Sequence, residues 1–198
     1  MKIENKDTKQ QILDTGYRLM VSKGFSSVGL SEILASAGVP KGSFYYYFKS
    51  KEQFGKEVID NYFSQYMIGL DEILNNSAGQ AYDRLIDYWQ RWVDTQSSEC
   101  DERKCLVVKL SAEVADLSES MRQVLLQGSM EVIERIALCI EEGGKDNSVV
   151  KLDPRSSAES LYTMWLGASL LSKLQQNSNA LLHAMKTTKL VLKNNTLI

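Results

Sequence analysis

Proline is scarce in this chain, and its scarcity limits what the chain can fold into. Pro40 and Pro154 are the only two prolines among 198 residues. Proline removes a backbone N–H donor and breaks helix interiors, so long stretches without it can stay helical. Alternating runs rich in β-branched residues, which would indicate strands, are nearly absent. We therefore predict an all-α fold with about nine helices.

The N-terminal region reads as two helices that lead into a tight turn. Thr8-Lys9-Gln10-Gln11 matches a capping box, so the first helix is predicted to begin at Thr8. Apolar residues then recur at helical spacing until Gly24, where a left-handed cap costs least. A second apolar stripe, from Leu30 to Ala37, is closed by Gly38-Val39-Pro40.

The next segment, Lys41-Gly42-Ser43-Phe44-Tyr45-Tyr46-Tyr47-Phe48, is unusually aromatic. Phe44 and Phe48 are one helical turn apart and can both face a core. Three consecutive tyrosines cannot all face the same core, because successive residues of a helix point in different directions. We therefore expect the tyrosines to spread over the remaining faces of a short helix.

Beyond Lys51 the pattern predicts one long amphipathic helix up to the Asn75-Asn76-Ser77 break. Further helices are predicted at about 79–97, 103–115, 117–142, 154–177 and 179–194. Ser97-Ser98, Asp116, Gly143 to Asn147 and Asn177 to Asn179 are the expected breaks. We predict a three-helix head over residues 1–51 and a larger helical body over residues 52–198.

The charge is divided unequally between these two regions. Residues 1–51 hold eight Lys or Arg against four Asp or Glu, a net charge of +4, whereas the remainder carries −6. A basic head on an acidic body favours contact with a polyanion through the head alone.

The head also carries a specific resemblance. It resembles the helix-turn-helix DNA-binding region of the TetR family of repressors in the run Leu30-x-x-Ile33-Leu34-x-x-Ala37-Gly38-Val39-Pro40-Lys41-Gly42-Ser43-Phe44-Tyr45-Tyr46-Tyr47-Phe48-Lys49-Ser50-Lys51-Glu52. The resemblance implies a repressor that binds a double-stranded DNA operator as a homodimer. It also implies a C-terminal body that binds a small-molecule inducer and forms the dimer.

On this resemblance the third helix enters the major groove and its neighbours contact phosphates. The residues expected in the groove are Lys41, Gly42, Ser43 and Tyr45. Those expected at phosphates are Tyr46, Tyr47 and Lys51. The family often has threonines where this chain has Val28 and Gly29, so Ser26 or Ser27 must supply any hydroxyl contact. Tyr47 stands where the family frequently has histidine, so the operator sequence does not transfer.

A second resemblance lies in the body, in residues 105–119 and 165–173. Both stretches are similar to the TetR branch that represses N-ethylmaleimide reductase and related detoxification genes, whose members sense electrophiles through a cysteine. The resemblance implies that Cys105 is the sensor, on which electrophiles or oxidants act to release the repressor from DNA. Lys173 matches a lysine of that branch, which implies that it approaches Cys105 and stabilises the thiolate; the alternative is a solvated lysine on the helix surface.

The neighbours of Cys105 make chemical sense of such a role. Arg103-Lys104 precedes it, Lys109 lies one turn onward, and a helix starting near residue 103 would add its N-terminal dipole. All three effects favour the reactive thiolate. The alternative is that Cys105 is a small buried hydrophobic residue, as most free cysteines are.

The other two cysteines lack these surroundings. Cys139 lies between apolar residues of a long helix and is expected in the core. Cys100 lies in an acidic loop that disfavours its thiolate, although it could be a resolving partner.

Two further sets of residues are weaker candidates. Tyr82, Trp89, Trp92 and Trp165 could line an apolar ligand pocket for a non-covalent inducer, although each is a typical core residue. The last two helices could form a four-helix dimer contact through Leu161, Trp165, Ala168, Leu171, Leu182 and Met185.

Several function classes are disfavoured. The single histidine, His183, and the cysteine spacing match no metal site, and we expect no cofactor. An enzyme using Cys105 as nucleophile would lack a histidine base beside it. The polar start and the lack of long apolar runs indicate a cytoplasmic protein.

Overall fold

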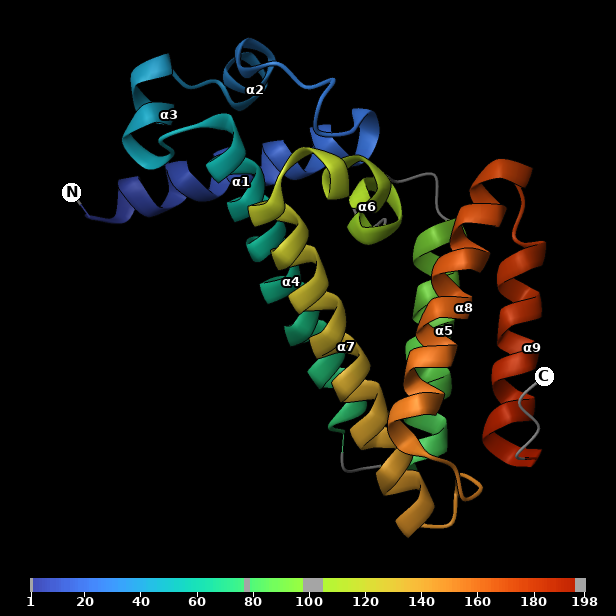
Figure 1. Cartoon of the computed structure of the whole chain (residues 1–198). Helices are drawn as coiled ribbons and strands as arrows, with labels where there is room; N and C mark the ends of the chain where they lie inside the picture. The colour runs from blue at the N-terminus through green and yellow to red at the C-terminus, as the bar shows by residue number, and fades with distance from the viewer. Residues whose placement is uncertain (1, 77–78, 98–104, 195–198) are drawn as a thin grey trace. The chain divides into compact units, whose positions relative to one another are not determined.

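The computed structural model describes residues 2–76, 79–97 and 105–194, and nine helices lie in this part of the chain (Figure 1). They are α1 (Lys2–Lys23), α2 (Leu30–Ala37), α3 (Lys41–Tyr47), α4 (Lys51–Leu74), α5 (Ala81–Ser97), α6 (Leu106–Leu117), α7 (Glu119–Lys145), α8 (Pro154–Gln175) and α9 (Asn179–Asn194). The described residues contain no strand, so the predicted all-α fold is confirmed. None of the described helices has a stretch of the length and apolar content that a membrane span requires.

The helices group into two compact units. The first comprises Met1–Gln65 and Lys104–Gly128, and the second comprises Tyr66–Arg103 and Ser129–Ile198. Helices α4 and α7 therefore contribute residues to both units, and α6 belongs to the first. The division into a DNA-binding domain over 1–51 and a sensing domain over 52–198 stays a prediction.

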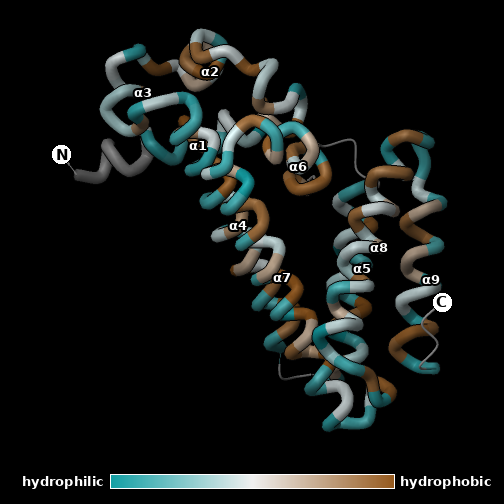
Figure 2. Tube along the Cα trace, viewed as in Figure 1, coloured by the Kyte–Doolittle hydropathy of each residue, from teal (hydrophilic) through white to brown (hydrophobic). Residues whose placement is uncertain are grey.

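The core of the first unit forms around α1. Helix α1 packs against α2 and α6, and hydrophobic and hydrophilic positions alternate along these helices (Figure 2). The rings of Phe44, Phe48 and Phe54 meet with centroids 5.1 to 5.3 Å apart. None of the three is more than 1% exposed, so the predicted inward positions of Phe44 and Phe48 are confirmed.

The predicted start of α1 is wrong. The helix begins at Lys2, so Thr8 lies inside it rather than at its cap. Residues 2–7 contain neither glycine nor proline and include good helix formers, so nothing in the sequence stops the helix from extending past the capping-box signal. Its end is as predicted: Gly24 has φ +85° and its N–H bonds to the carbonyl of Met20 at 2.9 Å.

In the second unit α9 packs against both α8 and α5 (Figure 1). Asp153 caps α8 by accepting a hydrogen bond from the Ser156 N–H, and Pro154 follows at the first helical position. The indole N–H of Trp165 donates to the Thr188 hydroxyl at 2.9 Å, which joins α8 to α9. Each buried tryptophan donor satisfied in this way avoids the cost of an unpaired polar group.

The predicted break at Gly143-Gly144 is also wrong, since α7 continues to Lys145. A Cβ atom at Gly143 would lie 2.4 Å from a methyl carbon of Val149, and the Val149 N–H donates to the Gly143 carbonyl at 3.0 Å. Gly143 therefore allows the returning chain to approach the helix closely. Helix α6 begins at Leu106, later than predicted, and residues 103–104 lie outside the described part of the chain.

Candidate DNA-binding site and sensor residues

The connection between α2 and α3 is a tight turn set by backbone geometry. Gly38 closes α2 in the left-handed region, with φ 63° and ψ 30°. The N–H of Val39 returns to the carbonyl of Leu34 at 3.1 Å, and Pro40 caps α3 in an extended conformation. Two short helices joined in this way form a helix-turn-helix.

Helix α3 has one buried side and one exposed side. Phe44 is fully buried, whereas Tyr45 is 49% exposed and Tyr46 is 72% exposed. Lys41 is also exposed, and its Nζ lies 5.8 Å from the centroid of the Tyr45 ring. These positions confirm the predicted spread of the tyrosines. They place cationic, hydroxyl and aromatic groups on the outer side of the second helix of the motif.

Gly42 is exposed on the same short helix. A Cβ atom added there would meet no described atom within 4 Å. Packing within the described chain therefore does not explain why glycine, which weakens a helix, stands at position 42. Ser43 and Tyr47 are half-buried, and their predicted DNA contacts, like those of Gly42, stay predictions.

Lys51 and Ser26, which are expected to contact DNA, both form hydrogen bonds within the chain. The ammonium of Lys51 donates to the Phe25 carbonyl at 2.8 Å and lies 4.4 Å from the Phe25 ring centroid. Burial lowers the pKa of Lys51, although nearby Glu113 opposes this shift. Ser26 and Ser27 are both exposed, and Ser26 bonds to the same Glu113 through its backbone N–H and its side chain. Sequence reasoning missed Glu113 altogether.

Cys105 is the N-cap residue of α6 and is 8% exposed. Burial raises the pKa of its thiol. This effect outweighs the hydrogen bonds from the backbone N–H groups of Val108 and Val107 and from the Tyr62 hydroxyl, which lower the pKa. The expectation that the surroundings favour thiolate is therefore wrong. The reason is burial, an effect that flanking charges in the sequence do not reveal.

The charged partners proposed for Cys105 also need correction. The ammonium of Lys109 donates to the carbonyl of Ser22 at 3.1 Å and is not among the groups that shift the pKa of the thiol. Arg103, Lys104 and Cys100 lie outside the described residues. Lys173 lies on α8 in the second unit, and its contact with Cys105 stays a prediction.

Cys139 is a core residue, as predicted. It is 2% exposed, and its Sγ donates to the Ala81 carbonyl at 3.6 Å. Burial raises the pKa of this thiol to about 12. Cys139 is therefore a much poorer nucleophile than an exposed cysteine at neutral pH.

The three tryptophans of the predicted pocket pack against one another. Trp89 and Trp165 stack with centroids 4.7 Å apart, and the indole N–H of Trp92 donates to Ser169 at 2.9 Å. Trp89 is fully buried, and its indole N–H has no hydrogen-bond acceptor among the described atoms. Tyr82 lies under the ammonium of Lys193, 4.0 Å from it. The rings of Tyr88 and Tyr162 also pack against the tryptophans, and we name these five residues, which do not include Tyr82, the aromatic cluster: Tyr88, Trp89, Trp92, Tyr162 and Trp165.

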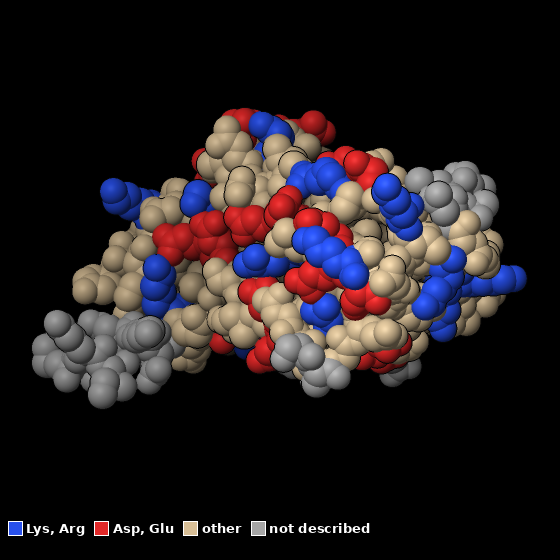
Figure 3. All heavy atoms as spheres, turned by 90° about the horizontal axis from the view of Figure 1, so that it is seen from below, with Lys and Arg blue, Asp and Glu red and all other residues tan. Residues whose placement is uncertain are grey.

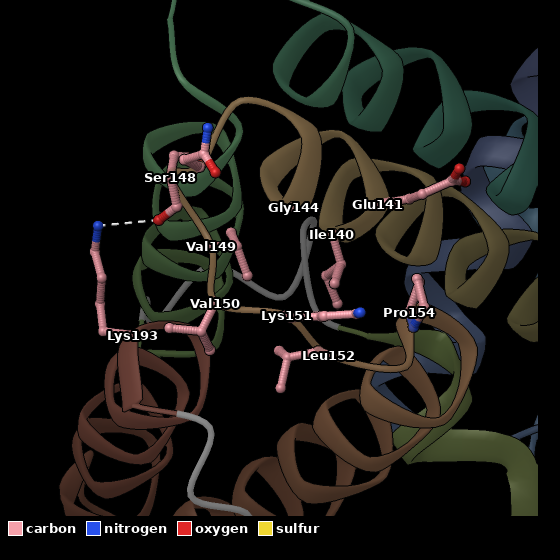
Figure 4. Close-up of a pocket in the computed structure, with 11 residues that line it drawn as sticks. Ile140, Glu141, Gly144, Ser148, Val149, Val150, Lys151, Leu152, Pro154 and Lys193 are labelled. Atoms are coloured by element: carbon pink, nitrogen blue, oxygen red, sulfur yellow. Dashed lines mark hydrogen bonds between the residues drawn. The ribbon is translucent and has the colours of Figure 1, made fainter.

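A cleft of about 700 Å³ lies elsewhere in the second unit, between the end of α7 and the segment leading into α8 (Figure 4). Lys193 reaches its edge and donates to the Ser148 carbonyl at 3.0 Å. Its lining joins apolar residues, Val149 and Leu152 among them, to polar ones. The residues predicted for the ligand pocket do not line this cleft.

The predicted dimer residues divide into two groups. Leu161 and Trp165 are at most 2% exposed within the single chain, so the expectation that they form a dimer contact is wrong. Their side chains pack inside their own unit instead. Ala168 and Met185 are also buried. Leu171 and Leu182 remain about half exposed, and we name them, with three further exposed leucines, the leucine surface: Leu170, Leu171, Leu174, Leu182 and Leu190.

Acidic and basic side chains are mixed on the face of the molecule that Figure 3 displays. Ion pairs of this kind include Arg84 with Glu142 and Arg155 with Glu134, each at 2.7 Å. Such pairs contribute little to stability and offer no concentrated charge to a polyanion.

Comparison with known families matches both parts of the chain. Residues 12–58 match bacterial regulatory proteins of the tetR family, and residues 81–188 match a tetracyclin repressor-like C-terminal domain. The transcriptional repressor NemR of Escherichia coli strain K12 is 38% identical over 184 residues, covering 92% of this chain and 92% of NemR. The repressor DhaR of Mycobacterium sp. strain GP1 is 31% identical over 174 residues, covering 87% and 86%.

Solved structures agree. The crystal structure of the reduced form of E. coli NemR superimposes with a TM-score of 0.88 at 39% identity, covering 92% of this chain and 95% of that one. A transcriptional regulator of the TetR/AcrR family superimposes with a TM-score of 0.86 at 43% identity, covering 95% and 100%.

Proposed function

Since this chain belongs to the TetR family of transcriptional regulators, we propose that it is a cytoplasmic repressor that binds a palindromic operator as a homodimer. An electrophile that modifies Cys105 releases it from DNA. Helix α3 enters the major groove, and its exposed side reads the operator.

The observation that carries the DNA-binding part is the division of α3 into two sides. Phe44 holds the helix on the core, while Lys41, Tyr45 and Tyr46 face solvent. Gly42 lies among them with open space around its Cα. A groove-binding helix needs such a side, because its backbone must approach the bases closely and its polar groups must remain available.

The leucine surface supports the dimer. Its members are 41 to 72% exposed, and they lie on two helices that pack against each other. A single small head makes few base contacts, so specific binding favours two heads on a two-fold operator. Covering an apolar surface of this kind with a second copy removes it from water.

Burial of Cys105 suggests how modification acts. The reagent reaches the sulfur only when the start of α6 opens, because the side chain is 8% exposed in the closed arrangement. A maleimide then adds the thiol across its C=C bond: the π bond breaks, the sulfur bonds to one of its two carbons, and the thiol proton ends on the other carbon. The adduct adds volume that a packed interior cannot hold, so it stabilises the open arrangement and shifts the population toward it.

The test is binding of the purified protein to the DNA upstream of its own gene, before and after stoichiometric N-ethylmaleimide. Wild type and Cys139→Ser should be released, and Cys105→Ser should stay bound. Release of Cys105→Ser together with wild type would remove Cys105 from the mechanism. If none of the untreated proteins bound this DNA specifically, the proposal that the chain is a repressor of its own gene region would be refuted.

A second inducer class is favoured by one observation. Trp89 buries an indole N–H without an acceptor among the described atoms, and a buried unpaired donor is costly. An apolar molecule with one carbonyl or ether oxygen would satisfy it within the aromatic cluster. Such a ligand should release Cys105→Ser from DNA and quench tryptophan fluorescence, and Trp89→Phe should abolish both effects.

A further inference from the structure

Helix α6 contacts the segment that joins α1 to α2. The carboxylate of Glu113 accepts a hydrogen bond on each oxygen, from the N–H of Phe25 at 3.0 Å and from the N–H of Ser26 at 2.6 Å. The Ser26 side chain adds a third bond to this carboxylate. Hydrogen bonds to a charged acceptor are stronger than neutral ones, so the link is stiff.

The same helix also holds the carbonyl end of α1. Lys109, one turn before Glu113, donates to the carbonyl of Ser22 at 3.1 Å. This carbonyl belongs to the last turn of α1, where backbone acceptors lack partners within the helix. Helix α6 thus binds both a backbone acceptor and two backbone donors on either side of Gly24.

Gly24 fits this arrangement closely. Its φ of +85° turns the chain, and a Cβ atom built there would lie 2.8 Å from a carboxylate oxygen of Glu113. The contact therefore depends on a glycine at the turn as well as on the acid.

The far end of α6 is tied to α4. One carboxylate oxygen of Glu52, in the first turn of α4, accepts from the hydroxyls of Ser118 at 2.6 Å and Ser120 at 3.0 Å. Helix α6 is thus connected at its start to Cys105, in its middle to the α1–α2 segment, and at its end to α4.

We infer that Glu113, assisted by Lys109, is a positioning residue that transmits displacement of α6 to the helix-turn-helix. This inference rests on the proposed function, since it assumes that modification at Cys105 moves α6. When the start of α6 shifts, the carboxylate carries Phe25 and Ser26 with it. These residues lie in the segment between α1 and α2, so the position of the motif changes.

The experiment compares Glu113→Gln with Asp116→Asn, which removes the same charge from an exposed position of the same helix. Operator dissociation constants are measured before and after N-ethylmaleimide treatment, and their ratio measures the coupling. We expect Glu113→Gln to lower the wild-type ratio about tenfold, within the range of common allosteric couplings. Asp116→Asn should retain the wild-type ratio.

A merely structural role predicts something else. If Glu113 only stabilised the fold, treated and untreated affinities would fall together and the ratio would stay that of wild type, which would overturn the inference. Hydrogen exchange gives a second readout. In wild type the adduct should change the exchange of the Phe25 and Ser26 amides, and in Glu113→Gln it should not. A wild-type ratio of one would instead refute the proposed thiol control, and the role of Glu113 with it.

Discussion

Helices α3 and α6 belong to the same compact unit but use their polar residues in opposite ways. On α3, Lys41, Tyr45 and Tyr46 face solvent. On α6, Lys109 and Glu113 bond to backbone groups of other segments, and the preceding Cys105 is buried. The difference teaches that α3 keeps its polar side chains exposed to solvent, whereas α6 uses its polar side chains to hold other segments of the chain in place.

The first prediction compares a substitution on the buried side of α3 with one on its exposed side. Phe44→Ala removes a fully buried ring that contacts Phe48 and Phe54. We expect a loss of about 3–5 kcal/mol in the free energy of unfolding, because large-to-small core changes leave a cavity. Urea denaturation measures it. Tyr46→Ala, at a 72% exposed position, is the control and should change stability by less than about 0.5 kcal/mol.

Gly42 tests the outer side. Gly42→Leu should weaken operator binding about a hundredfold or more, because the added side chain keeps the backbone of each head from the bases, whose contacts are worth about 1–3 kcal/mol. Stability should not fall, since a leucine has open space there and favours helix. Binding titrations and thermal unfolding check both parts. Gly144→Leu is the matched control, at an exposed helical glycine that also has open space. Equal binding by the Gly42 variant would contradict a groove-facing α3.

The inward character of α6 predicts the pH dependence of Cys105 alkylation. Burial raises the pKa of the thiol, so its thiolate fraction still grows with pH where an exposed thiol, with a pKa of about 8.5, is already mostly ionised. The rate with N-ethylmaleimide should still rise between about pH 8.5 and about pH 9.5, where the rate of an exposed thiol levels off. A Cys100→Ser, Cys139→Ser protein isolates the reaction, and its urea-unfolded form is the control. A plateau near neutral pH would show a favoured thiolate.

The sequence was most informative where the structure is local. The inward Phe44 and Phe48 and the outward tyrosines follow from helical spacing alone. The surroundings of Cys105 did not follow, because Tyr62 is distant in sequence and burial depends on packing. Glu113 was missed for the same reason: its partners Phe25 and Ser26 lie 88 and 87 residues away. Its type and spacing carry no signal of such a contact.

Two lysines of the first unit give the smallest and sharpest test of the comparison. Lys41 is exposed on α3, whereas Lys51 is half-buried and bonded to the Phe25 carbonyl. Each lysine that neutralises a phosphate contributes about 0.9 to the slope of log affinity against log salt, and one substitution removes two such lysines from a homodimer, about 1.8 in all. Lys41 is expected among the bases of the groove, where its exposed ammonium also lies near the flanking phosphates, so we expect Lys41→Met to reduce the measured slope. Lys51→Met should leave the slope nearly unchanged while lowering stability by about 1 kcal/mol. An equal reduction of the slope in both variants would mean that Lys51 contacts phosphate despite its internal bond, and the separation between presenting and organising residues would then fail at this position.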